Sequence, residues 1–496
     1  MLVGTGCHDA RLTTMVAQPN FSPAVAPWTD FGCPREFPRG PRTIQAALAA
    51  QPASLPLMSW GETTWTVGHF DQASLDLARR LVSDGVQVGQ PLAWSLSSPH
   101  DLLVAFLATV RAGAVWLAID QRATAHEEQH IVESIGCGLP RRELSTWDPT
   151  LGPVELPAPD PWRPAAIGHT SGTTGQSKGA VHLHQQLLYP GAASLEQRPP
   201  NGPERIATPL SLATFNIMLL VPLVALVRGA CAVIVEPQKG LAEQLVRYAA
   251  TEAVIVPAQL RDLAVDDALA NVSTLHSVIV GGARLDQEAA DRVATRGITV
   301  ISSYGMTETP TGVARRTSGE TGATLLPGIR ATVSNDGEIL LAPTQSGPWA
   351  GCWSPTLGYW NRPEASSDLY RDGWLHTGDR GSVDKDGRLS VLERIASMIN
   401  RGGATIAPQE VEDAIHACPG VDDVVVFGAD DQRLGQRIVA AVVGQGLDAA
   451  TLRNCARQRL SGHKVPDDWL FVDAFPRTTS GKVDRNALRE LAASPE

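Results

Sequence analysis

The stretch that decides the fold reads HTSGTTGQSKGAVHLH and spans residues 169–184. Gly172, Gly175 and Gly179 let the backbone turn tightly and approach an anion, and Lys178 adds a positive point charge. Hydroxyl donors for a phosphate are offered by Thr170, Ser171, Thr173 and Thr174. The pattern predicts a phosphate-binding loop that differs in spacing from the GxxxxGK(S/T) type. A flexible linker is disfavoured because the flanking sequence is apolar.

Around this loop, segments that predict strands alternate with segments that predict helices. Residues 70–86 (FDQASLDLARRLVSDGV) space apolar residues at helical intervals, and residues 91–120 read as strand, helix and strand. The same alternation returns over residues 206–300, and short strands with glycine-rich turns follow over residues 320–393. We therefore predict an α/β fold, with a large N-terminal body of mixed or parallel sheets flanked by helices and a small β-barrel-like subdomain.

The chain is also expected to divide along its length. Residues 1–40 are rich in proline, glycine and small polar residues and predict a loosely ordered arm. Residues 41–393 form the predicted N-terminal domain, and residues 394–496 form a small, mobile α+β C-terminal domain.

Further motifs follow the loop in a fixed order. They read LATVRAGAVWLAID (107–120), GGARL (281–285), SYGMTET (303–309), HTGD (376–379), LERIASMINRGGATIAPQEVE (392–412) and PRTTSGKVDR (476–485). With the loop, they make the chain resemble the acyl-adenylate-forming superfamily, which comprises acyl- and aryl-CoA synthetases, luciferases and the adenylation domains of peptide synthetases. The resemblance covers residues 64–489, and Ser177 replaces the proline usual in the loop.

The resemblance implies that ATP activates a carboxylic acid as its acyl-adenylate, with release of pyrophosphate. A carboxylate and a phosphate are both anions, so this reaction needs positive charge and orientation. Lys482 matches the lysine that reaches both anions from the C-terminal lid, and it is one of only 5 lysines beside 36 arginines. Glu308 matches the acid that holds Mg²⁺ against the phosphates. A solvated surface lysine is the alternative reading of Lys482.

The resemblance also assigns the remaining contacts to ATP. Tyr304 would stack on adenine, and Asp379 and Arg394 would contact the ribose. The other implied contacts are Gly281, Gly282, Ala283, Gly305, Met306 and Thr307. Core packing stays the alternative for Tyr304, and a surface ion pair stays the alternative for Arg394.

The acid pocket is expected from residues 208–223 together with Gly281. Phe215 and Asn216 stand where amino-acid-activating relatives have an aromatic residue and an aspartate that pairs with the α-ammonium group. A neutral Asn216 cannot balance a buried cation. The position of Asn216 resembles the asparagine of relatives that activate 2-hydroxyaryl acids, where it bonds a ring hydroxyl. We therefore predict an aryl acid, such as a hydroxy- or amino-substituted benzoate, or another acid without an α-amino group. Asn216 as an ordinary strand-end hydrogen bonder remains the alternative.

The acceptor of the acyl group stays open at this point. Gly403 matches the glycine that lines the path of a pantetheine thiol, which predicts transfer to CoA or to a carrier protein. An ordinary turn glycine beside Gly402 is the alternative for this residue. Ala396 and Ser397 stand where the family usually has charged hinge residues. This departure keeps a nitrogen acceptor, giving an amide or an N–N bond, as one alternative. A non-catalytic adenylate-binding protein is a second.

Composition limits the partners. A net charge of −11 argues against general binding to nucleic acid or to an anionic membrane surface. The N-terminus lacks the apolar segment of a secretion signal, so we expect a cytoplasmic protein. Seven cysteines without a CxxC pair predict reduced thiols.

One motif competes with this interpretation. The run His126-Glu127-Glu128-Gln129-His130 fits the HExxH pattern of zinc hydrolases. No third ligand is suggested nearby, so a chance match on a solvated helix is favoured.

Overall fold

The computed structural model describes residues 35–145, 153–170, 178–200, 202–236, 239–394, 397–401, 404–406, 408–431, 433–478 and 483–493. The chain divides into two compact units. The first comprises Met1–Thr332, Leu340–Thr377 and Val383–Ser390, and the second comprises Val333–Ile339, Gly378–Ser382 and Val391–Glu496. Most of the predicted arm lies outside the described residues, and the predicted boundaries at 40 and 393 stay predictions.

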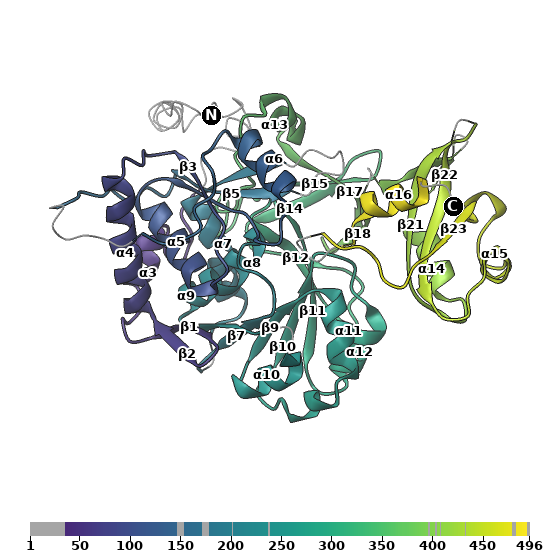
Figure 1. Cartoon of the computed structure of the whole chain (residues 1–496), viewed down its shortest axis with the longest axis horizontal. Helices are drawn as coiled ribbons and strands as arrows, with labels where there is room; N and C mark the ends of the chain where they lie inside the picture. The colour runs from purple at the N-terminus through teal and green to yellow at the C-terminus, as the bar shows by residue number, and fades with distance from the viewer. Residues whose placement is uncertain are drawn as a thin grey trace. The chain divides into compact units, whose positions relative to one another are not determined.

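A nine-stranded sheet runs through the first unit in the order β13-β12-β11-β10-β9-β7-β8-β1-β2 (Figure 1). Its inner strands from β1 to β11 pair in parallel, whereas β2, β12 and β13 join antiparallel at the two edges. The strands are β1 (Pro56–Trp60), β2 (Thr63–Thr66), β7 (Arg205–Thr208), β8 (Cys231–Ile234), β9 (Glu252–Ile255), β10 (Ser277–Gly281), β11 (Thr299–Met306), β12 (Thr311–Thr317) and β13 (Thr324–Leu325).

A second sheet of the first unit has the order β3-β4-β5-β6. Strands β3, β4 and β5 are parallel, and β6 turns back antiparallel to β5. The strands are β3 (Pro91–Trp94), β4 (Val115–Ala118), β5 (Pro164–Thr170) and β6 (Lys178–Leu183). The hairpin of β5 and β6 is therefore the element that carries the predicted phosphate loop.

Several helices of the first unit begin at a residue whose side chain caps the first turn. Thr66 accepts a hydrogen bond from His69 N, so α4 (Val67–Ser83) begins three residues before the predicted helix. Ser98 caps α5 (Pro99–Arg111), whose proline stands in the first turn, where its missing N–H costs nothing. The others are α3 (Ile44–Ala49), α6 (Ala125–Ile135), α7 (His184–Gln197), α8 (Phe215–Met218), η2 (Leu219–Leu223), α9 (Val224–Arg228), α10 (Leu241–Arg247), α11 (Pro257–Val265), η4 (Asp267–Asn271), α12 (Gln287–Ala294) and α13 (Pro363–Leu369).

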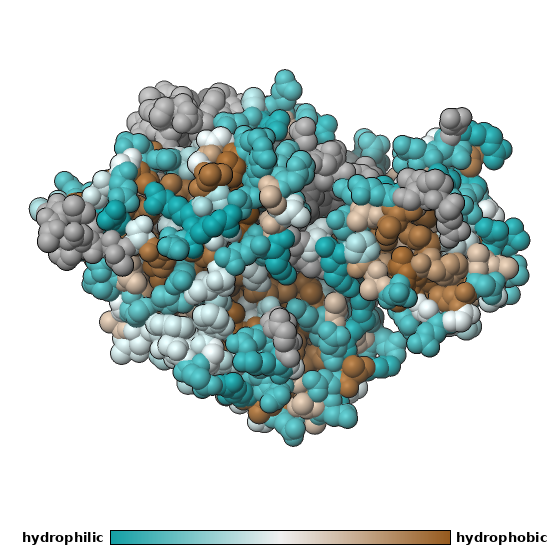
Figure 2. All heavy atoms as spheres, in the orientation of Figure 1, coloured by the Kyte–Doolittle hydropathy of each residue, from teal (hydrophilic) through white to brown (hydrophobic). Residues whose placement is uncertain are grey.

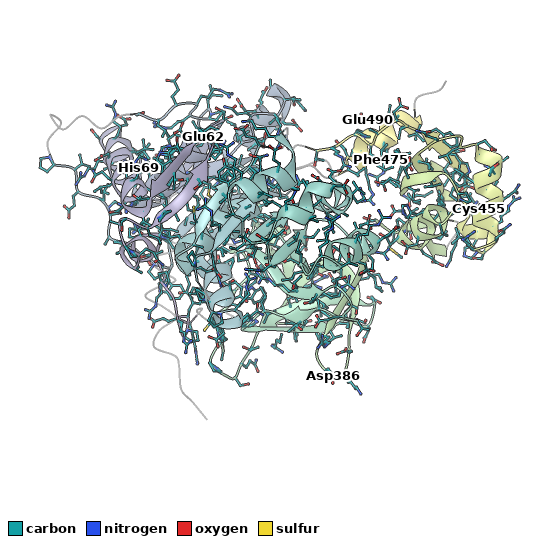
Figure 3. All side chains as sticks on the ribbon, turned by 90° about the horizontal axis from the view of Figure 1, so that it is seen from below. Glu62, His69, Asp386, Cys455, Phe475 and Glu490 are labelled. Carbon is teal, nitrogen blue, oxygen red and sulfur yellow. A yellow bond between two sulfur atoms is a disulfide. The ribbon has the colours of Figure 1, made fainter. Side chains whose placement is uncertain are left out.

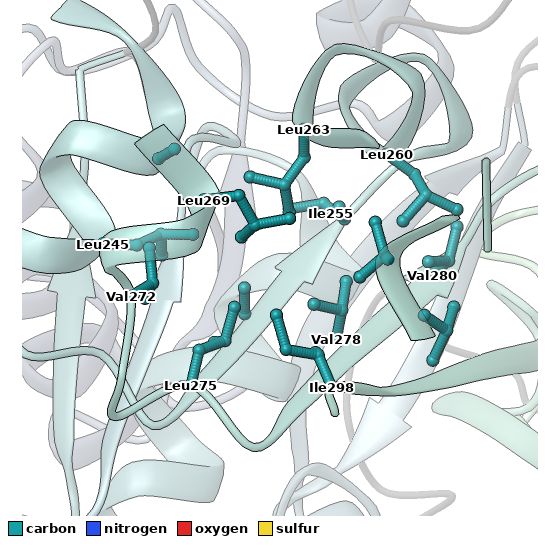
Figure 4. Packing of buried hydrophobic residues seen from close by; sticks show 14 of the residues in the cluster. Leu245, Ile255, Leu260, Leu263, Leu269, Val272, Leu275, Val278, Val280 and Ile298 are labelled. Atoms are coloured by element: carbon teal, nitrogen blue, oxygen red, sulfur yellow. The ribbon is translucent and has the colours of Figure 1, made fainter. Parts of the chain in front are cut away.

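One well-packed core lies between the nine-stranded sheet and the helices α10, α11 and α12 (Figure 4). Leu245, Leu260 and Leu263 come from the helices and pack against Ile255 and Val278 of the sheet. Each is at most 1% exposed, so this side of the sheet is sealed from water. The core supports β10 and β11 from behind and leaves their carboxyl ends for the site.

Five shorter strands form a further sheet with the order β14-β15-β17-β16, and β18 pairs with β17. The strands are β14 (Ile329–Val333), β15 (Glu338–Pro343), β16 (Tyr370–Arg371), β17 (Trp374–Val383) and β18 (Leu389–Arg394). The pairings among the described strands do not close into the predicted barrel. The fold class, an α/β body with a smaller α+β unit, is confirmed.

The second unit carries its own sheet, in the order β20-β19-β22-β21, with β23 beside β22. Figure 2 shows apolar side chains on the surface of this unit, and Phe471 and Leu491 are among its exposed hydrophobic residues. The elements are β19 (Ile399–Arg401), β20 (Ala404–Ile406), α14 (Pro408–His416), β21 (Val421–Asp431), β22 (Gly435–Gly444), α15 (Ala449–Arg457), η6 (Gly462–Lys464), β23 (Asp468–Phe471) and α16 (Arg485–Ala493).

Cys418 and Cys455, the latter on α15 and labelled in Figure 3, form a disulfide in this unit. The prediction of uniformly reduced thiols is therefore wrong. The two cysteines are 37 residues apart in the sequence, and only the packing of α15 beside the end of α14 brings them together. No helix of the described residues is long and apolar enough to cross a bilayer.

Candidate functional site

The hairpin of β5 and β6 holds both ends of the predicted phosphate loop. Thr170 is the register partner of Lys178, and His169 is the partner of Gly179. A Cβ atom at Gly179 would lie 2.7 Å from side-chain carbons of both Ile135 and Ile167. Gly179 is therefore needed for close packing, and not for the tight turn expected from the sequence, because it lies within β6 and its φ is not positive. Ser171, Gly172, Thr173 and Thr174 lie outside the described residues.

Glu308 stands in a tight turn that follows β11. The hydroxyl of Thr309 lies 3.0 Å from both N and O of Met306 and donates to the carbonyl of Thr311 at 2.9 Å. Gly305 faces the Thr311 backbone so closely that a side chain would not fit. The run YGMTET thus builds the turn from its own polar groups. Glu308, which lies in this turn, is only 6% exposed.

A tyrosine connects this turn to the phosphate hairpin. The hydroxyl of Tyr359 donates to Glu308 Oε1 at 2.6 Å, and Lys178 Nζ lies 5.0 Å from the centroid of the Tyr359 ring. Lys178 and Glu308 were predicted site residues, and the structure brings them to one aromatic ring. Tyr359 was missed. Its only signal is the run GYWNRPE (358–364), in which a tyrosine follows a glycine shortly before a proline that begins α13.

The predicted adenine contacts meet at the ends of two neighbouring strands. Gly281 ends β10 and pairs with Ser303 of β11, the residue before Tyr304. Gly282 adopts φ = +87°, a conformation that suits glycine. Parallel β10 and β11 therefore bring the Gly281 end of β10 next to the Tyr304 end of β11, and a role of these residues in binding adenine stays a prediction.

Phe215 and Asn216 begin the short helix α8, close to the phosphate hairpin. The Phe215 ring stacks on His182 of β6 with centroids 4.8 Å apart and planes at 20°. A Cβ atom at Gly168 of β5 would lie 2.6 Å from the Phe215 ring. The Oδ1 atom of Asn216 is buried, and no described residue donates a hydrogen bond to it.

His182 is a second residue that the sequence interpretation missed. Burial lowers its pKa to about 3, although the nearby Thr307 backbone favours the charged form. Neither ring nitrogen forms a hydrogen bond of standard geometry within the described residues. A neutral imidazole is consequently stacked on the Phe215 ring. A histidine within a predicted strand does not indicate such a contact, so the sequence alone could not predict it.

Two further predicted residues belong to the second unit. Asp379 lies in β17 and is 5% exposed, and the preceding Gly378 donates its N–H to Glu338 Oε1 at 2.8 Å. Arg394 ends β18. Lys482, Gly403 and Ala396 lie outside the described residues, so their roles stay predictions.

Helix α6 contains the competing HExxH run. Glu127 closes a capping box with Thr124, and both carboxylate oxygens of Glu128 accept from Arg142. Among the residues that the structure describes, no three His, Cys, Asp or Glu side chains gather as metal ligands.

The sequence matches the AMP-binding enzyme family over residues 44–140 and 138–347, and the AMP-binding enzyme C-terminal domain over residues 410–482. The chain belongs to the AMP-binding enzyme family. It is an acid–AMP ligase of the acyl-CoA synthetase type, as the sequence resemblance implied.

Three similar proteins can be aligned over most of this chain and over nearly all of their own length. A feruloyl-CoA synthase of Amycolatopsis sp is 29% identical over 479 residues, which cover 86% of this chain and 94% of that protein. A 2-succinylbenzoate–CoA ligase of Listeria monocytogenes is 27% identical and covers 90% and 98%, respectively. The ATP-bound structure of MatB from Rhodopseudomonas palustris superposes with a TM-score of 0.78 at 26% identity, covering 91% and 98%.

The residues present fit a magnesium-bound nucleotide. Mg²⁺ prefers hard oxygen ligands, and Glu308 offers a carboxylate whose Oε1 is engaged by Tyr359. No described residue donates a hydrogen bond to its Oε2. The Lys178 ammonium lies over the ring face of the same tyrosine, and such a group can meet a phosphate.

Proposed function

We propose that this AMP-binding enzyme activates a hydroxy-substituted aryl carboxylic acid with ATP and transfers the aryl acyl group to CoA. In the first step a carboxylate oxygen attacks the α-phosphorus, and the bond to pyrophosphate breaks. In the second step the thiol sulfur of CoA attacks the acyl carbon, AMP leaves, and the thiol proton passes to solvent.

The observation that carries the choice of acid is the Asn216 amide. Its buried oxygen needs a hydrogen-bond donor, because leaving such an acceptor unpaired costs about 1–3 kcal/mol. A ring hydroxyl supplies a neutral donor, whereas an α-ammonium group would bring a charge that this amide cannot balance. Phe215, the preceding residue, stacks one face of its ring on His182, and the rest of the ring would pack against an aromatic acid. The relatives named for feruloyl and 2-succinylbenzoate substrates support an aryl acid.

Each predicted site residue would then have its own role. Lys178 would neutralise phosphate charge, and the turn of Glu308 would hold Mg²⁺, which supplies charge neutralisation on the pyrophosphate side when bound with ATP. Gly281 and Tyr304 would enclose the adenine. Asp379 and Arg394 would contact the ribose, and Lys482 would bridge the carboxylate and the α-phosphate.

CoA is the proposed acceptor because the named relatives are CoA ligases. Gly403 is the residue past which the pantetheine arm would reach the adenylate. A carrier-protein thiol or a nitrogen nucleophile becomes the answer only if adenylate forms and no CoA ester follows.

The test is a pyrophosphate-release screen over hydroxybenzoates, hydroxycinnamates, unsubstituted aryl acids, fatty acids and amino acids, with and without CoA. We expect release with hydroxyaryl acids and a CoA ester on chromatography. Asn216→Ala should erase the preference for the hydroxylated over the unsubstituted ring, which is about tenfold for one hydrogen bond. A preference for fatty or amino acids, or one unchanged in Asn216→Ala, would overturn the proposed acid.

A further inference from the structure

The segment of residues 356–360 connects the two halves of the nucleotide site in the first unit. On one side, Thr356 N donates to the carbonyl of Glu308 at 2.7 Å. On the other side, its hydroxyl donates to Val181 O at 2.7 Å, and Trp360 N donates to Gly179 O at 2.8 Å. The backbone of this segment therefore ties the Glu308 turn to β6, the strand that begins at Lys178.

Tyr359 lies in the middle of the segment and contacts a charged group of each half. Its hydroxyl donates to Glu308, and the face of its ring meets the Lys178 ammonium. Only 8% of the residue is exposed. Its N–H donates to Ser366 Oγ at 2.8 Å, and the Ser366 hydroxyl in turn lies 2.6 Å from Arg362 O. Packing and backbone anchoring thus leave the phenol little freedom.

We propose that Tyr359 is a positioning residue that orients Glu308 for Mg²⁺-ATP, an inference that rests on the proposed function of this site. A phenol hydroxyl is a neutral donor, so it fixes one carboxylate oxygen without cancelling the charge. The second oxygen keeps that charge for a hard cation. An ammonium in the same place would neutralise the acid and compete with the metal.

The ring contributes separately from the hydroxyl. A cation over a tyrosine face is attracted by the ring quadrupole, and this attraction persists when the hydroxyl is removed. Tyr359→Phe should therefore keep the packing and the contact with Lys178 while releasing the Glu308 carboxylate to rotate.

The chain offers a matched control. Tyr370 also buries a phenol in this cluster, and burial raises its pKa, with a further contribution from the charge of Glu308. Its hydroxyl donates to Thr356 O at 2.5 Å and not to the carboxylate. Tyr370→Phe removes one buried hydroxyl from the same cluster without touching the acid.

The experiment measures binding by calorimetry on the full chain without any acid substrate. The ligands are Mg²⁺-ATP, ATP with a chelator, and AMP. For Tyr359→Phe we expect the Kd of Mg²⁺-ATP to rise about tenfold, with the Kd of AMP and of metal-free ATP changed less than about twofold. Tyr370→Phe should change all three alike or not at all. In a Glu308→Gln background, Tyr359→Phe should add nothing.

Two results would overturn the proposal. One is that Tyr359→Phe raises the Kd of Mg²⁺-ATP and the Kd of AMP by the same factor, or behaves as Tyr370→Phe does. The other is that Tyr359→Phe still raises the Kd of Mg²⁺-ATP in the Glu308→Gln background. If Tyr359→Phe does not fold, as judged by thermal melting, Ser366→Ala loosens the anchor and should give the same selective loss in smaller size. If the Kd of AMP rose as much as the Kd of Mg²⁺-ATP in Ser366→Ala, the result would contradict the proposal. Because no acid is present, a wrong proposed substrate leaves this result intact. A wild type that does not bind Mg²⁺-ATP would overturn both proposals.

Discussion

Two short motifs of the first unit place glutamates beside polar neighbours, and the fold uses them in opposite ways. On α6, Glu127 is exposed and accepts from the backbone of Thr124, and Glu128 gives both oxygens to Arg142. In the turn after β11, Glu308 is buried and shares one oxygen with a neutral phenol. A carboxylate can bind a cationic ligand only where the protein's own residues do not neutralise its charge. The burial of a glutamate and its hydrogen-bond partners therefore distinguish a candidate ligand-binding acid from a structural one better than the sequence motif does.

The sharpest extension of this comparison concerns two lysines. Lys464 is paired with Glu410 at 2.6 Å, whereas Lys482 is proposed to meet substrate anions. Lys482→Ala should lower the rate of pyrophosphate release by about a thousandfold, because the lost contact acts on charge in the transition state. Lys464→Ala should leave that rate near wild type. Near-normal release by Lys482→Ala would contradict its role, and transfer from a supplied acyl-adenylate should change much less.

The next largest effect tests the two glutamate motifs directly. Glu308→Gln should lower kcat/KM for Mg²⁺-ATP by about a hundredfold, because the amide lacks the charge that faces the metal. Glu128→Gln, on α6, should leave kcat/KM unchanged. Binding of preformed acyl-AMP should suffer little in Glu308→Gln, since that ligand has no β- and γ-phosphates. Equal losses for both ligands would indicate a general structural defect.

Three buried histidines of the first unit also predict that the stability of the protein depends on pH. Burial lowers the pKa to about 4 for His169, with His130 nearby, and to about 3 for His182 and for His184, with Arg163 nearby. In the unfolded chain these groups titrate near pH 6.5 and take up protons that the folded protein refuses. The free energy of unfolding should therefore fall as the pH drops from 6.5 toward 4, by about 2 kcal/mol per histidine at pH 5.

Urea unfolding at pH 7 and pH 5 measures this loss. His182→Leu should flatten the pH dependence relative to wild type, whatever its effect at pH 7. An identical pH dependence in the two proteins would mean that the His182 imidazole is charged in the folded state.

A smaller effect is expected at the acid pocket. Asn216→Asp should lower kcat/KM for the aryl acid by about tenfold, because a second carboxylate would face an anionic substrate in a poorly solvated place. Asn216→Ala serves as the uncharged comparison. Unchanged activity of Asn216→Asp on the aryl acid would place residue 216 outside the pocket.

The smallest effect belongs to α6. Thr124→Ala removes the capping box and should lower the free energy of unfolding by about 1 kcal/mol, with kcat/KM unchanged. Calorimetric melting together with the pyrophosphate assay would check both halves. A loss of activity at full stability would assign α6 a part in the chemistry after all.

The sequence could predict the fold class, and through the family resemblance it could name candidate site residues that lie in continuous runs. Gly281 and Tyr304 end up together because parallel β10 and β11 finish at one edge, which strand alternation already implied. Tyr359 could not be predicted as the partner of Glu308, since 51 residues separate them and only the pairing of the 356–360 segment with β6 closes the distance. The bond between Cys418 and Cys455 was missed for the same reason, because isolated cysteines reveal nothing of their spatial neighbours.

The missing side chain of Gly168 has a consequence for anyone who redesigns this enzyme. The space that a Cβ atom would take is filled by the Phe215 ring and by a methyl group of Thr307. Strand β5, which leads into the predicted phosphate loop, the Phe215 ring of the proposed acid pocket and the turn that contains Glu308 therefore touch one another at a single point. A substitution that enlarges or shifts Phe215 to admit a different acid would press on the nucleotide-binding backbone as well. Libraries that aim at a new substrate should vary residues 168, 215 and 307 jointly.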